Sequence, residues 1–243
     1  MKNYSHVISL GFFCSTALEL EKIGLRDSSY PFDWLITDFK GVLECIESDF
    51  DGFLQYENLS QYRRIPEHYF DKKYQFHFYH DFSAYKSLDE QITFVQEKYH
   101  RRIQKFVRNI TQPTLFIRYV SNQKELNFIE KDYKQIIDIL KSKNENNELL
   151  LIANDQIKSK TLKIFNVEKD EGDVVARTFL EKNADLKELL LSDDIYDKNK
   201  RALNLDIYNK KQENKSNSNY QRITSKIRKL LKRPYVHSAI YSH

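Results

Sequence analysis

Cys14 is the residue of this chain with the clearest potential for nucleophilic chemistry. It follows a short apolar run that predicts a buried strand ending at Gly11, and a helical pattern begins just after it. A thiol at a helix N-terminus lies at the positive end of the helix dipole, which lowers its pKa and favours the reactive thiolate. The alternative is that Cys14 fills core volume, as free cysteines often do. Cys45 lies within a predicted helix, and we expect it only to pack.

His80 is the candidate base for the proton of Cys14, because imidazole titrates near neutral pH. It lies in residues 74–82, where mainly aromatic residues alternate with mainly polar ones, with the period of two that is typical of a strand. A buried, hydrogen-bonded histidine on an aromatic face is an equally good interpretation. Asn154 or Asp155, after a later apolar strand, could orient the imidazole, although polar residues at strand ends more often form turns.

Three further residues are candidates for contacts with a substrate. Arg118 lies near the end of an apolar strand and could bind a carboxylate or phosphate, although such an arginine is often only a surface charge. Asp33 and Trp34, in a loop, could wall the crevice, and core anchoring is the favoured role of Trp34. The chain has no Cys-x-x-Cys, no His-Glu-x-x-His and no glycine-rich phosphate loop, so we expect neither a metal nor a nucleotide cofactor.

These candidates are positioned by strands that alternate with helical patterns. In the aromatic segment the phenylalanines share one face, and His77 and Tyr79 lie on the other. Capping boxes, Thr16 with Glu19 and Ser87 with Glu90, mark two helix starts. The expected strands are residues 6–11, 74–82, 114–120 and 149–153, and more weakly 162–167 and 174–179, and the expected helices are 16–24, 38–54, 87–110, 126–140 and 184–191. This order predicts an α/β fold with a mainly parallel central sheet flanked by helices, whose strands end at one crevice. The direction of the aromatic strand is left open.

Composition and charge limit the classes of protein to which the chain can belong. Its 243 residues are 40% hydrophobic, which is enough for a large domain with a buried core. The net charge is +4, but residues 210–243 hold nine Lys or Arg against one Glu, a net of +8, which leaves 4 − 8 = −4 for residues 1–209. The basic isoelectric point therefore describes the tail, and we expect no nucleic-acid partner. Only two cysteines, and no leader or long apolar stretch, predict a cytoplasmic protein.

The C-terminal region, residues 201–243, is predicted to be separate from an α/β domain at residues 1–200. Residues 210–219 are polar and lack periodicity, which predicts a linker. In the segment that follows, apolar residues can share one helical face, surrounded by Arg222, Lys226, Arg228, Lys229, Lys232 and Arg233. This pattern predicts a basic, partly helical tail that contacts the inner face of an anionic membrane. A disordered tail, or a helix docked on the acidic body, is equally consistent with it.

Several motifs together resemble a known family. They are Ile8-Ser9-Leu10-Gly11-x-x-Cys14, Gly24-Leu25-Arg26, Pro31-Phe32-Asp33-Trp34, His80-Asp81-Phe82 and Leu115-Phe116-Ile117-Arg118. They are similar to a bacterial family of unknown function described as papain-like cysteine peptidases, over about residues 6 to 155. The resemblance implies Cys14 as nucleophile, His80 as general base, and then Asn154 or Asp155. The strand that leads directly into Cys14 also resembles the layout of SGNH-type esterases and acyltransferases.

The leading hypothesis is a cysteine-dependent hydrolase that attacks an acyl or amide carbonyl through Cys14. Helix N-terminal amides near Ser15 and Thr16 would hold the oxyanion, and the substrate would be a peptide or an acylated small molecule or glycan. One alternative is a cysteine-dependent acyltransferase or esterase in bacterial surface-polysaccharide biosynthesis. Another is a non-catalytic binding module that contacts the membrane through its tail.

Overall fold

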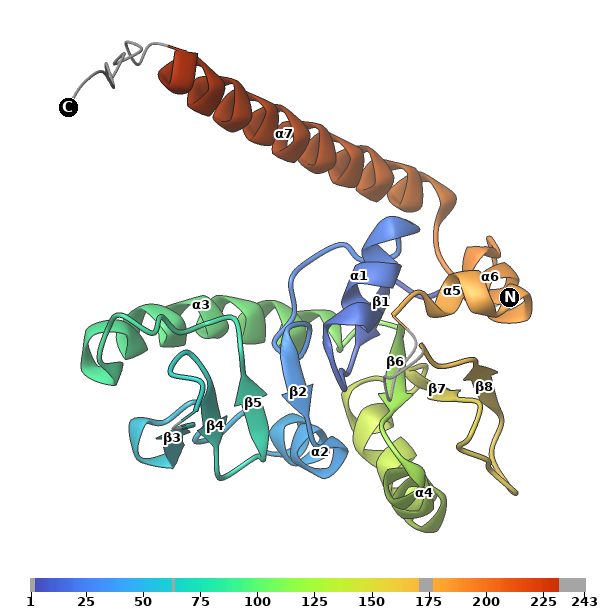
Figure 1. The fold of residues 1–243 in the computed structure, drawn as a ribbon. Coiled ribbons are helices and arrows are strands. Elements are labelled where there is room, and N and C mark those ends of the chain that lie inside the picture. Colours follow the sequence, from blue (N-terminus) through green and yellow to red (C-terminus); the bar gives the residue numbers. More distant parts are fainter. Residues whose placement is uncertain (1–2, 63, 171–176, 232–243) are drawn as a thin grey trace, which may run out of the picture.

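The structure, a computed structural model, describes residues 3–62, 64–170 and 177–231, with side chains up to residue 216. Its centre is a four-stranded parallel sheet in the order β1-β6-β7-β8 (Figure 1). These strands are β1 (His6–Ser9), β6 (Thr114–Val120), β7 (Glu148–Asn154) and β8 (Ile164–Val167). The expected α/β fold with a parallel central sheet is therefore confirmed.

Helices cover both faces of the parallel sheet, because alternate residues of its strands point to opposite sides. On one side, side chains such as Val7 and Ile117 form a core with α1 (Cys14–Lys22), α5 (Phe179–Lys182) and α6 (Ala184–Leu191). On the other side, side chains such as Ile8 and Phe116 form a larger core with α2 (Phe39–Glu47), α3 (Leu88–Asn109) and α4 (Gln123–Lys143). The side-chain and backbone hydrogen bonds of Ser87 and Glu90 confirm the capping box at the start of α3.

A second, antiparallel sheet of four short strands extends the larger core (Figure 1). Its strands, in spatial order, are β2 (Leu35–Thr37), β5 (Phe76–Phe78), β4 (Tyr69–Asp71) and β3 (Leu59–Gln61), and the short helix η1 (Tyr56–Asn58) precedes β3. The single strand expected over residues 74–82 is corrected to residues 76–78. The Asp71 carboxylate accepts the N–H groups of Lys73 and Tyr74, so the residues before β5 form a turn.

Two helix boundaries also differ from the sequence predictions. α1 begins at Cys14, two residues before the expected capping box, and the Thr16 hydroxyl donates to the carbonyl of Gly11 (3.4 Å). It ends at Lys22, and Gly24 follows with φ +75° and carries the chain out of the helix, as predicted. α2 ends at Glu47, because Asp49 and Phe50 adopt positive φ and turn the chain towards the second sheet.

The C-terminal helix α7 (Lys198–Leu231) runs through the segment predicted to be a polar linker, which is therefore helical. Its first turns dock on α1, where the Asn204 side chain donates to the carbonyl of Gly24 (2.9 Å) and Lys211 pairs with Glu21. Of the strand expected over residues 174–179, residues 174–176 lie outside the described part of the chain, and Phe179 begins α5.

The membrane-facing tail and the division at residue 200 remain predictions. Arg222, Lys226, Arg228 and Lys229 belong to α7, but their side chains lie outside the described part of the chain, as do Lys232 and Arg233 entirely. The predicted boundary at residue 200 falls within α7. No described helix combines the length and the apolar character needed to cross a bilayer.

Candidate functional site

The carboxyl end of the parallel sheet is where the chain divides between the two faces. After β1 the chain enters α1 on one face, whereas after β6 it enters α4 on the other. Neighbouring parallel strands whose connections leave in opposite directions create a crevice beyond their carboxyl ends. Gly11 turns the chain at this point with φ +84°, and a Cβ there would lie 2.3 Å from the Thr37 hydroxyl. Only glycine therefore fits this turn.

Cys14 lies at this edge of the sheet as the first residue of α1, and its side chain is half-buried. Phe13 is the N-cap residue, so no side chain caps the helix by accepting a hydrogen bond from its first amides. The ring of Phe13 packs edge-on against Tyr119 of β6 with 5.4 Å between centroids, which anchors the segment that carries the thiol. The first N–H groups of α1 therefore point from a fixed position towards the carboxyl end of the sheet.

The electrostatic setting of Cys14 differs from the sequence prediction. Burial raises the pKa of the Cys14 thiol above its ordinary value, whereas its backbone hydrogen bond and the positive charge of Arg177 act in the opposite direction. The expected lowering by the helix N-terminus is thus outweighed by desolvation. At neutral pH the resting group is a protonated thiol.

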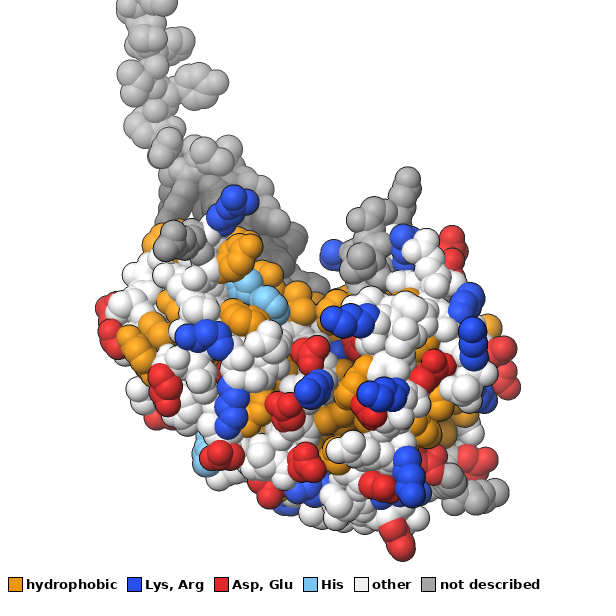
Figure 2. Space-filling model, turned by 90° about the horizontal axis from the view of Figure 1, so that it is seen from below, with side chains coloured by type: hydrophobic (Ala, Val, Ile, Leu, Met, Phe, Trp, Pro, Cys, Tyr) orange, Lys and Arg blue, Asp and Glu red, His pale blue; other side chains and the backbone are white. Residues whose placement is uncertain are grey.

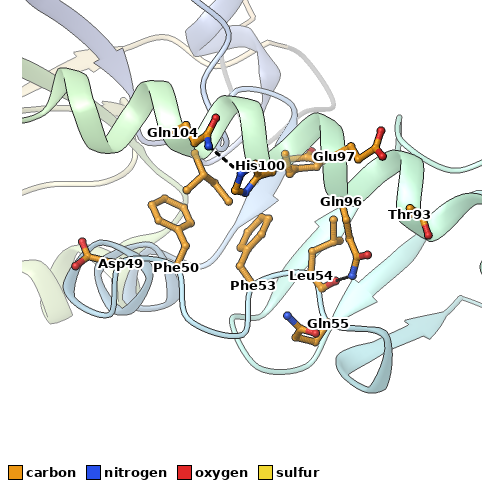
Figure 3. A pocket seen from close by; sticks show the side chains of 12 residues that line it. Asp49, Phe50, Phe53, Leu54, Gln55, Thr93, Gln96, Glu97, His100 and Gln104 are labelled. Carbon is orange, nitrogen blue, oxygen red and sulfur yellow. Dashed lines mark hydrogen bonds between the residues drawn. The ribbon is translucent and has the colours of Figure 1, made fainter.

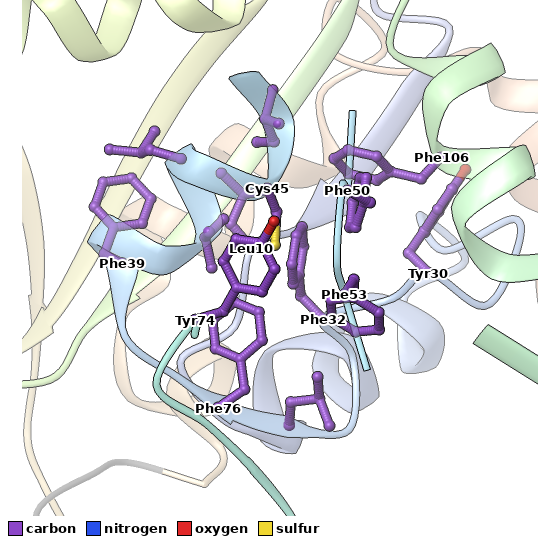
Figure 4. Close-up of a cluster of buried hydrophobic side chains, with 14 of the residues drawn as sticks. Leu10, Tyr30, Phe32, Phe39, Cys45, Phe50, Phe53, Tyr74, Phe76 and Phe106 are labelled. Carbon is purple, nitrogen blue, oxygen red and sulfur yellow. The ribbon is translucent and has the colours of Figure 1, made fainter. Parts of the chain in front are cut away.

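Cys45 has the purely packing role that the sequence predicted. Its side chain is fully buried in the larger core, where Figure 4 shows it among aromatic rings that include Phe32, Phe50 and Tyr74. Burial strongly raises the pKa of the Cys45 thiol. The two cysteines therefore form an internal comparison, with one at the edge of the parallel sheet and one sealed in the core.

The structure does not bring the imidazole of His80 to Cys14. The N–H of Thr37, at the end of β2, donates to the carbonyl of Phe12 (3.0 Å), beside Cys14. β5 is antiparallel to β2, with Phe76 beside Thr37, so the chain moves away from Phe12 as it approaches His80. His80 is exposed at the far end, and within the described residues no hydrogen bond joins it to Cys14.

The segment around His80 is held at that far end by α3. The carboxylate of Asp81 forms an ion pair with Lys98 and accepts a hydrogen bond from the Tyr99 hydroxyl (3.0 Å). The Asp81 side chain is almost completely buried, at 2% exposure. A buried carboxylate with two partners fixes its segment. The contacts of Asp81 with α3 therefore keep the segment that carries His80 at the far end of β5, away from Cys14.

Arg118 is buried and fully engaged with the protein, which does not agree with its expected role in binding a substrate anion. Its Nε donates to Glu125 (2.7 Å), and Nη1 donates to the carbonyl of Leu10 and to the Thr37 hydroxyl (2.7 Å each). Its Nη2 donates to the carbonyl of Thr37 (2.9 Å). The guanidinium thus connects β6, α4, the end of β1 and the end of β2. These hydrogen bonds hold the ends of β1 and β2 beside β6.

Asp33 and Trp34 also lie away from the carboxyl end of the parallel sheet. Asp33 is fully buried, and one of its oxygens accepts from Arg26 (2.7 Å) and from the N–H of Tyr30 (2.8 Å). Burial raises the pKa of the Asp33 carboxyl, although the nearby charge of Arg26 acts against it. The Cζ atom of Arg26 lies over the Trp34 ring, 5.9 Å from the ring centroid. Trp34 also lines a cavity of about 290 Å³ that α7 borders. The expectation that they wall the crevice is corrected, because they stabilise their own loop.

Asn154 and Asp155 form the turn that follows β7. The Asn154 side chain accepts the N–H of Gln156 (2.9 Å), and its carbonyl accepts the N–H of Ile157 (3.1 Å). Asp155 is exposed. Asn154 thus forms a turn, which is the sequence-based alternative to orienting an imidazole. The turn belongs to the parallel sheet, whereas His80 lies on the second sheet, so these residues are not placed to orient its imidazole.

A crevice of about 500 Å³ opens where the two sheets meet, and its residues were not singled out from the sequence. It is bordered by Phe12 after β1, Thr37 at the end of β2, Ser121 after β6, and the outer face of the second sheet with His77. The strand alternation correctly placed His77 and Tyr79 opposite the core phenylalanines. His68, which pairs with His77, had no sequence signal, because it precedes a strand of only three residues.

Another cavity, of about 650 Å³, lies elsewhere, between α3 and the loop after α2. Figure 3 shows Phe50, Phe53 and Leu54 on one side and Gln96 and His100 on the other. The Gln96 side chain donates to the carbonyl of Leu54 (3.0 Å) and connects the two sides. None of the predicted site residues borders this cavity. Within the described residues no group of three or more His, Cys, Asp or Glu is arranged to hold a metal ion.

Comparison with known proteins identifies relatives of this chain. The family model described as "Putative papain-like cysteine peptidase (DUF1796)" matches residues 5–156. An uncharacterized protein, R408, of Acanthamoeba polyphaga mimivirus is 28% identical over 177 residues, which cover 60% of this chain and 75% of the relative. No solved structure matches the chain. The family match covers every predicted site residue outside the tail. The bacterial setting and the link to surface polysaccharides stay predictions, because this relative is viral.

Proposed function

The chain belongs to the family described as "Putative papain-like cysteine peptidase (DUF1796)", and on this premise we propose that it is a cysteine-dependent hydrolase whose Cys14 attacks an acyl or amide carbonyl. The family model matches residues 5–156, which is more than half of the 243 residues. Cys14 is the only cysteine of the chain that is not sealed in the core.

The observation that carries the proposal is the position of Cys14 as the first residue of α1, at the carboxyl end of β1. A nucleophile there has helix N-terminal amides beside it, and these can donate to the oxygen of a tetrahedral intermediate. Phe13 supplies no side-chain cap that would occupy them. The same edge of the sheet is where ligands bind in open parallel sheets.

The proposed step begins with loss of the thiol proton of Cys14. The sulfur then forms a bond to the carbonyl carbon, and the electron pair of the C=O bond moves to the oxygen, which accepts hydrogen bonds from the N–H groups of Ser15 and Thr16. The intermediate collapses when the bond to the leaving group breaks, and the leaving group takes up a proton. Water then hydrolyses the thioester and restores the thiol.

The proton of Cys14 passes to the solvent in this proposal, because His80 lies at the far end of β5. Arg177 is the charged group that favours the thiolate, through its electrostatic attraction. The raised pKa of Cys14 means that the thiolate fraction, and with it the hydrolytic rate, increases as the pH rises towards and beyond the ordinary thiol value.

Site-resolved alkylation tests the state of this thiol. We expect iodoacetamide to modify Cys14 in the folded chain. Its rate should reach a plateau at a higher pH than the rate for a free thiol does, because burial favours the protonated form. Cys45 should react only on unfolding, because it is fully buried. Peptide mass spectrometry after timed labelling from pH 6 to 10 measures both rates.

The control is His80→Ala, which should leave the pH profile of Cys14 unchanged, because the imidazole lies at the far end of β5. Alanine in place of this exposed histidine should be tolerated by the fold. A Cys14 that stays unlabelled in the folded chain contradicts the proposal. A profile that shifts to higher pH in His80→Ala contradicts the role given to the solvent.

A further inference from the structure

The crevice where the two sheets meet has the features of a ligand site in its own right. We call it the inter-sheet crevice. Its volume of about 500 Å³ falls in the range of small-molecule sites, and it lies at the carboxyl end of the parallel sheet. Figure 2 shows the molecule from below, where histidine side chains lie beside hydrophobic ones on the surface. Phe12 and Ser121 contribute to it from the two loops that part at this edge.

One side of the inter-sheet crevice is the outer face of the second sheet. Ile36, His77, Phe70 and Ser60 lie opposite one another on β2, β5, β4 and β3, so they form one row across the sheet. All four border the crevice. The rings of Phe70 and His77 are 4.7 Å apart between centroids. This row gives the crevice a flat, partly aromatic wall.

His77 is paired with a buried histidine. Its Nδ1 lies 2.9 Å from Nε2 of His68, which is only 2% exposed and stacks on Tyr79 with 4.0 Å between centroids. Nδ1 of His68 is buried and has no hydrogen-bond partner in the described structure. The other nitrogen of His77, Nε2, also has no partner among the described residues, and His77 borders the crevice.

The unpartnered nitrogen of His68 determines which atoms of the pair carry hydrogen. If His77 donated from Nδ1, His68 would have to carry its hydrogen on the buried Nδ1, where an unsatisfied N–H is costly. The favoured arrangement is therefore donation from Nε2 of His68 to Nδ1 of His77. His77 then carries its hydrogen on Nε2 and presents an N–H donor to the crevice. Burial lowers the pKa of both histidines, which keeps the pair neutral near pH 7.

The charges around the inter-sheet crevice disfavour an anionic ligand. No lysine or arginine is among its described lining residues, whereas Asp38 and Glu125 contribute carboxylates. Glu125 pairs with Arg118 and accepts from the Ser121 hydroxyl, and Asp38 caps α2 by accepting from Gly41. The remaining polar groups are neutral hydroxyls and amides, such as those of Ser60, Gln61 and Gln75. A phosphate or carboxylate would find no compensating cation among the described lining residues.

The form of the wall favours a ring-shaped ligand over an extended peptide. A peptide strand is typically held by the free edge of a sheet, whereas the row containing His77 presents side chains from the face of a sheet whose inner strands are paired on both sides. Aromatic rings and neutral hydrogen-bonding groups together suit a ligand with one apolar face and many hydroxyls. A sugar ring has this combination.

We propose that the inter-sheet crevice is a carbohydrate-binding site in which His77 donates its Nε2 hydrogen to an oxygen of a neutral sugar. The proposal goes beyond the thiol chemistry of Cys14 and does not depend on it. His68 acts as a positioning residue that fixes the hydrogen of His77 on Nε2.

The test is a titration of the full chain, labelled with ¹⁵N-histidine, with cellobiose, maltose and N,N′-diacetylchitobiose, followed by long-range ¹H–¹⁵N NMR of the histidine rings. We expect His77 in the Nε2–H form before titration. At least one of the saccharides should shift its Nε2 signal in a saturable way. Glucose 6-phosphate and N-acetyl-dialanine amide should leave it unchanged.

Matched variants identify the contribution of the donor. His77→Phe keeps a ring but removes the donor and should weaken saccharide binding about tenfold, whereas His77→Gln keeps a donor and should lose less. His100→Phe, on the exposed side of α3, is the control and should bind as the wild type does. Failure of all three saccharides to bind, an Nδ1–H form of His77, or unchanged binding in His77→Phe would overturn the proposal. So would a response of His77 to the phosphate or the peptide. If His77→Phe does not fold, the wild-type titration still decides.

Discussion

Cys14→Ala is expected to lower thiol-dependent hydrolysis of an activated ester such as p-nitrophenyl acetate by at least about a thousandfold, to the uncatalysed background. The physical reason is that the alanine methyl group cannot form the thioester through which the reaction proceeds. Cys45→Ala should keep its activity, because that side chain is sealed in the core and touches no ligand. Release of p-nitrophenol measured for both variants from pH 7 to 10 checks the prediction.

The pH dependence adds a second criterion to this comparison. Wild-type activity should keep rising above pH 8, because the raised pKa of Cys14 delays formation of the thiolate. Activity that survives in Cys14→Ala, or that is lost equally in Cys45→Ala, would show that the observed hydrolysis does not use this thiol. A blocked peptide p-nitroanilide, assayed in parallel, distinguishes an amide hydrolase from an esterase.

Arg118→Ala should destabilise the chain by about 3–5 kcal/mol, because it leaves buried partners without a counterion or donor. The Glu125 carboxylate, at 10% exposure, would lose its cation, and the carbonyls of Leu10 and Thr37 would lose their hydrogen bonds. Urea unfolding followed by far-ultraviolet circular dichroism measures the free energy of unfolding.

The matched control for Arg118 is Lys143→Ala, which breaks an ion pair to Asp49, a residue that is 65% exposed. An exposed pair of this kind contributes about 0–1 kcal/mol, so the two variants should differ by several-fold in their effect. Equal effects would contradict the view that Arg118 holds the ends of β1, β2 and β6 together. A large loss for Arg118→Ala would support a structural role for its buried hydrogen bonds to Glu125, Leu10 and Thr37.

The parallel sheet could be predicted from the sequence because its two central strands, β6 and β7, are seven residues long and mostly apolar. Thr114–Val120 is buried at every position, and β6 has the predicted bounds. The helix over residues 88–109 was also predictable, because its capping box and its steps of three and four residues are local signals. Cys45 was assigned to packing for a similar reason, since its neighbours within one helix determine its burial.

The second sheet could not be predicted because its strands are only three residues long. A strand such as Tyr69–Asp71 is too short to show alternation, and its pairing depends on turns formed by side chains such as Asp71. The direction of β5 therefore stayed open in the sequence. That direction decides that His80 lies far from Cys14, whereas strand alternation alone places His77 on the face opposite the core phenylalanines.

The roles of single site residues depended on contacts between distant segments. The sequence indicated only a charged residue near the end of a strand for Arg118, because its partner Thr37 belongs to the other sheet. Cys14 was placed correctly at a helix N-terminus, but its pKa depends on how deeply the fold buries it, which no local pattern reports. Patterns along the chain thus predicted the position of the thiol correctly, but they did not predict its protonation state.

The central claim, that the Cys14 sulfur becomes covalently bonded to the acyl group, is tested most directly by trapping the thioester. The full chain is mixed with p-nitrophenyl acetate, quenched in acid during turnover, digested, and examined by mass spectrometry. The account predicts an acetyl group on the peptide that contains Cys14, formed at the rate of the initial burst and absent after the ester is exhausted. An unmodified Cys14 during sustained turnover, with acetyl groups only on lysines, would contradict it.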